Sequence, residues 1–179
     1  MRRSILRPPG ASGSLRGMKQ EPIRPTDEQA RDLARRLLSQ MRHAVMGTLD
    51  PATGTPLVTR ISVQIDDDGI PVALLSGLSA HSRALQADLR VGLLVSDDEA
   101  VKGDPMAHAR LSILARAELA PLDEHRREQW LARAPKARAY IDLPDFRYWR
   151  LVPQSALLNG GFGQAFHLTP DDMRQTPAA

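Results

Sequence analysis

Short β-type segments joined by tight turns constrain this chain more than any other feature of its sequence. Residues 56–65 carry a run of β-branched side chains, and residues 109–119 alternate apolar with polar side chains. Asp66-Asp67-Asp68-Gly69 is typical of a hairpin turn, because glycine can adopt positive φ. Strands joined by only a few residues must run antiparallel. The sequence therefore predicts a small antiparallel barrel or sheet with packed helices.

The expected helices and strands follow one another from residue 25 onward. The capping-box pattern Thr26-Asp27-Glu28-Gln29 predicts the start of an amphipathic helix. We expect a second, short helix capped by Ser79, a third over 121–134, and a last helical turn from Thr169. The predicted strands are 43–49, 56–65, 70–76, 91–95, 109–119, 146–152 and 155–159, the last two separated by Pro153.

The positive charge of the chain is concentrated at its N-terminal end. The whole sequence has 24 Lys and Arg against 21 Asp and Glu, but residues 1–24 alone hold six basic residues and one acid. The remaining 18 basic and 20 acidic residues give that part a net charge of −2. We therefore expect residues 1–24 to form a disordered basic tail and residues 25–179 to form the folded domain. Nucleic-acid binding by the domain is not indicated.

The origin of the basic tail stays open at the level of sequence. Met18 would open a shorter chain, so residues 1–17 are either an over-extended translation start, a native tail without a role, or a functional extension. No apolar run approaches the roughly 20 residues of a membrane-spanning helix. The tail also lacks the apolar core of a secretory signal. We expect a cytoplasmic protein that does not cross a membrane.

The sequence lacks the residue patterns that several common kinds of catalytic and metal site require. Cysteine is absent, which excludes disulfides, thiolate metal centres and cysteine nucleophiles. There is no glycine-rich nucleotide loop and no nucleophile elbow, and the five histidines show no metal-ligand spacing. No catalytic residue is assigned. A bound cofactor is therefore the expected source of any redox chemistry.

One group of residues has the composition of a phosphate site. Arg60 lies on the second predicted strand, and the segment Ser76–Arg83 leaves the third strand and enters a helix. This segment offers hydroxyls, free backbone N–H groups and a cation, which together suit a phosphate group. The alternative interpretation is a capped helix with solvated polar residues.

The order and spacing of several segments resemble those of a known superfamily. The segments are Arg60, Leu75-Ser76, Ser79-Ala80-His81-Ser82-Arg83-Ala84-Leu85, Asp88–Leu94, Gly103-Asp104-Pro105, Asp145–Leu151 and Gly160–Phe166. Together they resemble the pyridoxamine 5′-phosphate oxidase-like, FMN-binding split-barrel superfamily. The likeness is closest to its HugZ-type (haem-utilisation) branch and covers roughly residues 28–167.

This resemblance implies a mainly β, six-stranded antiparallel split β-barrel with flanking helices. It also implies a homodimer with FMN bound at the interface, and a flavoprotein that acts as an oxidoreductase on an unidentified small-molecule substrate. The residues it implies for FMN binding are Arg60, Ser76, Ser79, His81, Ser82 and Arg83.

Two other functions remain open under the same resemblance. In haem-degrading members, a histidine near the C-terminus ligates the iron, and His167 is the candidate here. A solvent-exposed histidine without a ligand is the simpler interpretation of that position. A non-enzymatic dimer that only binds flavin is the third possibility. The C-terminal Arg-x-His set of the vitamin oxidases is absent, so synthesis of pyridoxal phosphate is not expected.

Overall fold

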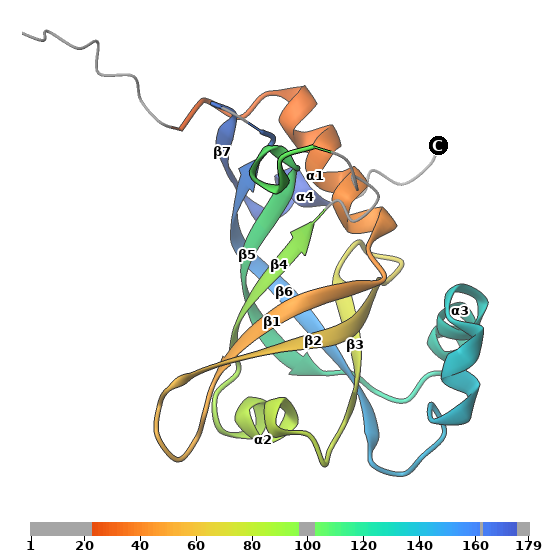
Figure 1. Ribbon diagram of the computed structural model, residues 1–179. Helices are drawn as coiled ribbons and strands as arrows, with labels where there is room; N and C mark the ends of the chain where they lie inside the picture. Colours follow the sequence, from red (N-terminus) through yellow and green to blue (C-terminus); the bar gives the residue numbers. More distant parts are fainter. Residues whose placement is uncertain (1–22, 97–102, 162, 175–179) are drawn as a thin grey trace, which may run out of the picture.

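The computed structural model describes residues 23–96, 103–161 and 163–174 and forms one β-barrel with helices around it (Figure 1). The predicted disordered tail covers residues 1–24. Residues 1–22 lie outside the described residues, so the disorder of the tail stays a prediction. The helices are α1 (Glu28–Gln40), α2 (Ala80–Ala87), α3 (Glu124–Arg133) and α4 (Pro170–Met173), with 3-10 turns η1 (Pro105–Ala107) and η2 (Pro135–Ala139). The strands are β1 (His43–Leu49), β2 (Pro56–Ile65), β3 (Pro71–Ser76), β4 (Arg90–Ser96), β5 (Arg110–Leu119), β6 (Phe146–Asn159) and β7 (Ala165–Leu168).

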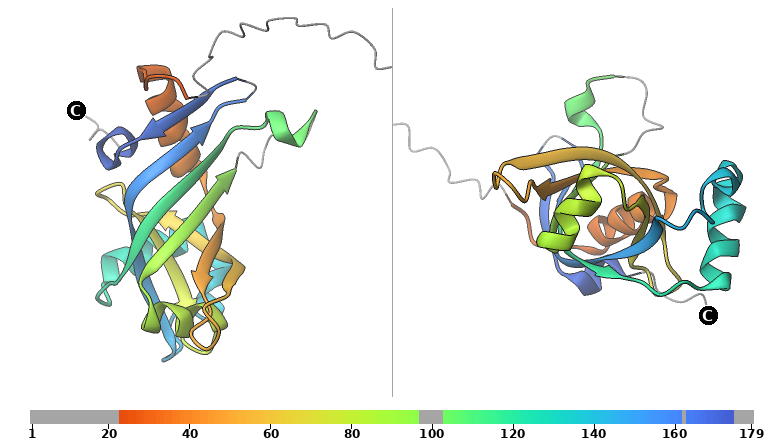
Figure 2. Two further views of the ribbon diagram at one scale, coloured as in Figure 1. Left: turned by 90° about the vertical axis from the view of Figure 1, so that its left-hand side faces the viewer. Right: turned by 90° about the horizontal axis from the view of Figure 1, so that it is seen from below.

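The strands form one sheet that closes on itself. Their order within the described residues is β3-β2-β1-β4-β5-β6-β7, and each neighbouring pair is antiparallel. β3 also pairs with the first part of β6, which joins the two sides of the sheet. The last part of β6 pairs with β7, which extends beyond the closed barrel (Figure 2). The predicted six-stranded antiparallel split barrel is confirmed.

The end of the sheet differs from the prediction in two ways. Residues 146–159 form a single strand of 14 residues, so the predicted break at Pro153 is wrong. The pairing register with β5 shifts between Leu114 and Ala115, and Ala115 lies opposite Pro153. This irregularity accommodates a residue that has no N–H to donate. β7 was not predicted, since four residues are too few to show a period.

The helix caps agree with the sequence patterns at two positions and differ at a third. The N-cap of α1 is Asp27, whose side chain accepts from the Ala30 N–H, and not Thr26. The Thr26 hydroxyl donates instead to the His167 carbonyl and so ties the approach to α1 to β7. Ser79 caps α2, and Thr169 forms a capping box at α4. The capping predictions for α2 and α4 are confirmed.

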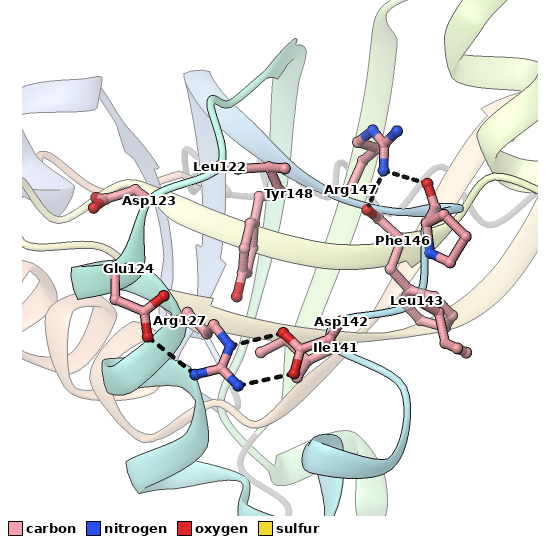
Figure 3. Close-up of a pocket in the computed structure, with 11 residues that line it drawn as sticks. Leu122, Asp123, Glu124, Arg127, Ile141, Asp142, Leu143, Phe146, Arg147 and Tyr148 are labelled. Carbon is pink, nitrogen blue, oxygen red and sulfur yellow. Dashed lines mark hydrogen bonds and ion pairs between the residues drawn. The ribbon is translucent and has the colours of Figure 1, made fainter.

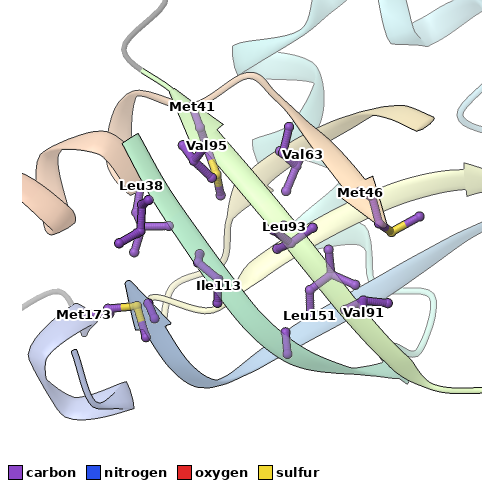
Figure 4. Close-up of a cluster of buried hydrophobic side chains, with 14 of the residues drawn as sticks. Leu38, Met41, Met46, Val63, Val91, Leu93, Val95, Ile113, Leu151 and Met173 are labelled. Atoms are coloured by element: carbon purple, nitrogen blue, oxygen red, sulfur yellow. The ribbon is translucent and has the colours of Figure 1, made fainter. Parts of the chain in front are cut away.

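The barrel holds the main hydrophobic core, and a second, smaller core lies outside it. Inward side chains of the strands pack with the buried face of α1 (Figure 4). On the outer face of β3 and β6, Val72, Leu74 and Tyr148 pack against Trp130 of α3 and Ile141. α2 lies across the end of the barrel opposite α1 and β7 (Figures 1 and 2). No helix among the described residues is long and apolar enough to cross a membrane.

Candidate functional site

Three predicted site residues meet at the turn between β3 and α2. The Ser76 carbonyl accepts hydrogen bonds from the hydroxyls of Ser79 (2.8 Å) and Ser82 (2.7 Å). The Ser76 hydroxyl donates to the Asp145 carboxylate (2.5 Å). The structure therefore brings the serines together, but their hydroxyl protons point at protein acceptors. The cluster caps α2 and joins this turn to the loop before β6, and its role in FMN binding stays a prediction.

His81 and Arg83 lie on the first turns of the same helix. His81 is half-buried, and burial lowers the pKa of its imidazole below the ordinary value, which favours the neutral form at neutral pH. Arg83 is exposed and donates to the Leu78 carbonyl (2.7 Å). Hydrogen bonds from Thr53 and, to a lesser extent, the Arg83 charge lower the pKa of Asp50, in the β1–β2 turn. Of these two residues, Arg83 carries the full positive charge at neutral pH.

Arg60 lies on the outer face of β2. It is exposed and forms no hydrogen bond or ion pair with any described residue. Strand pairing places it at one end of a row of outward residues, which continues through Val45, Leu94, Ser112, Leu157 and His167. We call these six residues the outer row. Neighbouring strands are about 4.8 Å apart, so its two ends are separated by about 24 Å along the curved sheet.

His167 lies at the other end of the outer row, on β7. Its side chain is exposed, and its neighbour in register on β6 is Leu157, which is also exposed. β7 lies beside α1 and α4, at the end of the barrel opposite α2 (Figure 1). The predicted residues therefore occupy three places: the β3–α2 turn, the outer face of β2, and β7.

Two residues important for the geometry were not singled out from the sequence. Asp145 binds the Ser76 hydroxyl, and its carbonyl also accepts from the Gly77 N–H (2.7 Å). Tyr148 on β6 has a buried hydroxyl with no hydrogen-bond partner among the described residues. Asp145 and Ser76 are 69 positions apart, so no local spacing pattern could have paired them.

The closed barrel, with β7 beyond it and helices at both ends, defines a pyridoxamine 5′-phosphate oxidase-like split barrel. A solved structure from Clostridium acetobutylicum, related to general stress protein 26 of the pyridoxinephosphate oxidase family, superposes with a TM-score of 0.63 at 14% identity. That alignment covers 83% of this chain and 99% of the other.

Within this class, the chain belongs to the CREG β-barrel family, whose model matches residues 25–174. It is 29% identical to the heme oxygenase HutZ of Vibrio cholerae over 133 residues, which cover 72% of this chain and 74% of that protein. A heme binding protein from Mycobacterium smegmatis is 27% identical, with a TM-score of 0.73 over 84% of this chain and 61% of its own. Another solved structure is 61% identical, with a TM-score of 0.82 over 86% of this chain and all of its own.

Proposed function

We propose that this protein binds haem as the substrate of haem degradation, with His167 as the ligand of the iron. The observation that carries the proposal is the position of His167: an exposed imidazole beside the exposed Leu157, at one end of the outer row. Imidazole is a common axial ligand of haem iron, and apolar side chains suit the face of a porphyrin. The names of the Vibrio cholerae and Mycobacterium smegmatis relatives support the same function.

The residues around His167 fit such a ligand. Its side chain makes no hydrogen bond to another residue in the described part of the chain, so a ring nitrogen is free to coordinate. The backbone beneath it is fixed on both sides, because β7 pairs with β6 and the His167 carbonyl accepts from Thr26. Bound haem would supply redox-active iron, while the side chains of this chain would hold and orient the macrocycle.

The proposal includes a homodimer formed through the outer face of the barrel. Val58 and Leu114 are 65% and 62% exposed on that face, on either side of Gly47 and Gly92. Large apolar side chains beside a shallow glycine surface are typical of a self-association patch. A second copy on this face would cover these side chains and would enclose the outer row.

Haemin titration of the full chain tests the proposal directly. We expect one haem per chain and a Soret band that is lost or displaced in His167→Ala. The matched control is His125→Ala, which removes an exposed histidine of α3. A Soret band unchanged in His167→Ala would contradict the assignment of the iron ligand. Adding ascorbate then tests enzymatic action, since degradation bleaches the band and releases iron to a chelator.

Flavin binding is the second candidate, favoured by the serine cluster and Arg83 at the start of α2. A helix start with hydroxyls and a nearby guanidinium suits a phosphate group. Titration with FMN, followed by quenching of its fluorescence, tests this site in parallel with haemin. Binding of FMN but not of haemin would replace the haem proposal with a flavoprotein. Turnover of a small substrate would then separate an oxidoreductase from a non-enzymatic flavin-binding dimer.

A further inference from the structure

A cavity outside the barrel lies between α3 and the loop that precedes β6 (Figure 3). Its volume is about 480 Å³, within the range of small-molecule sites. It borders the second core, on the outer face of β3 and β6, and contains none of the residues proposed above to bind haem or FMN. Three features of its lining indicate a particular kind of ligand.

The first feature is the phenol of Tyr148. The residue is 3% exposed, and its hydroxyl has no hydrogen-bond partner in the described part of the chain. Burial raises the pKa of this phenol to about 12, so it stays protonated and can both donate and accept. The hydroxyl points toward Glu124, Arg127 and Asp142 (Figure 3). A buried hydroxyl without a partner is costly, and a bound polar group would remove that cost.

The second feature is the charge beside that hydroxyl. Arg127 donates from Nε and Nη2 to Asp142 (2.7 and 2.8 Å) and from Nη1 to Glu124 (3.0 Å). Two carboxylates therefore surround one guanidinium, and these three groups together carry a net charge of −1. Both carboxylates are largely exposed and keep free lone pairs. The spare hydrogen-bonding capacity at this end therefore includes acceptor lone pairs on both carboxylates.

The third feature is an apolar wall that nothing in the described chain covers. Leu122 is 73% exposed and Leu143 is 48% exposed, and both line the cavity together with Phe146. At this apolar end, Arg147 uses Nη1 to donate to the carbonyls of Pro144 (2.6 Å) and Phe146 (2.7 Å). Exposed leucines beside a cavity give a ligand apolar surface to bury.

We infer that this cavity binds a small amine with an aromatic or branched aliphatic body. Its ammonium group would donate to Glu124, Asp142 and the Tyr148 hydroxyl, and its apolar body would lie against Leu122 and Leu143. An uncharged analogue keeps the body but loses the attraction to the carboxylates. An anion of the same shape meets repulsion at the hydroxyl end.

Three probes of similar shape test the charge preference in the full chain. Benzylamine, benzyl alcohol and phenylacetate are titrated at millimolar concentration and followed by two-dimensional NMR. We expect affinity to fall in that order, with benzylamine shifting the backbone signals of Arg127 and Asp142. Tightest binding by phenylacetate would indicate an anion site at Arg147 and would overturn the inference. So would the absence of shifts at these residues with every probe.

Two variants and a matched control test the location. Tyr148→Phe removes only the unpartnered hydroxyl, so the fold should tolerate it. We expect this variant and Leu122→Ser each to weaken benzylamine binding by about three- to tenfold. Leu78→Ser is the control, because Leu78 is 78% exposed near the start of α2 and does not line the cavity. Unchanged affinity in both test variants, or an equal loss in the control, would overturn the inference.

Discussion

At the scale of single residues, Ser79 links a helix start to the strand before it. Its hydroxyl oxygen accepts from the Ser82 N–H, and the same group lies 2.8 Å from the Ser76 carbonyl. We predict that Ser79→Ala lowers the free energy of unfolding by about 1 kcal/mol, since α2 loses its N-cap. Urea denaturation measures the change. In Ser39→Ala, where the hydroxyl only donates to Arg36 within α1, the loss should stay below about 0.5 kcal/mol.

His81 gives stability a dependence on pH. Burial lowers its pKa in the folded state, whereas the unfolded chain has the ordinary value of about 6.5. The unfolded state therefore binds more protons just below pH 6.5, and this residue's effect on stability becomes unfavourable as the pH falls from about 7 toward 5. We predict that His81→Gln flattens this part of the curve of unfolding free energy against pH. A wild-type slope retained by the variant would show that another group is responsible.

At the scale of elements, the β2–β3 turn fixes α3 to the barrel. The Asp66 carboxylate accepts from Arg126 of α3 (3.0 Å) and from Arg150 of β6 (2.7 Å), and it is only 10% exposed. Asp67, next to it, is exposed and contacts His125 and Gln129 of the same helix. Asp66 and Asp67 thus both contact α3, but Asp66 is nearly buried and Asp67 is exposed.

This difference predicts unequal effects of the same substitution. Asp66→Asn should lower the free energy of unfolding by about 1–3 kcal/mol, because Arg126 loses its close carboxylate partner and Arg150 keeps only Asp68. Asp67→Asn should cost much less than Asp66→Asn, as expected of an exposed ion pair. Hydrogen exchange should show the loss of protection in α3 for Asp66→Asn. Similar losses for both variants would contradict the role given to Asp66.

Local patterns predicted most elements, and long-range pairing decided the rest. The bounds of β1 and β2 agree with their prediction, since both have alternating or β-branched side chains between clear turns. β6 continues through Pro153 because its pairing register with β5 shifts at that point. The proline in the sequence gives no sign of this shift. Within the candidate site, Ser79 followed from helix capping and Ser82 from the family resemblance, whereas the Asp145 partner of Ser76 depends on the closed barrel.

At the scale of the whole molecule, the outer face with the exposed Val58 and Leu114 is the proposed dimer interface. We predict that Leu114→Glu shifts the proposed homodimer to monomer, because a buried carboxylate without a counter-charge opposes association. Leu78→Glu, at a leucine near α2 that is similarly exposed, should leave the oligomeric state unchanged. Sedimentation velocity measures both. A monomeric wild type at micromolar concentration, or a dimer retained by Leu114→Glu, would contradict the proposed interface.

The pairing of β3 with β6 has a consequence for synthesis on the ribosome. Ser76 finds its partner Phe146 only 70 positions later. At 5 to 20 residues per second, the nascent chain waits about 4 to 14 s between translation of these two residues. During that interval β3 has no partner on one side and presents unpaired backbone groups. The free edge of β3 can then pair with a strand of another chain, which makes it the point where aggregation would begin.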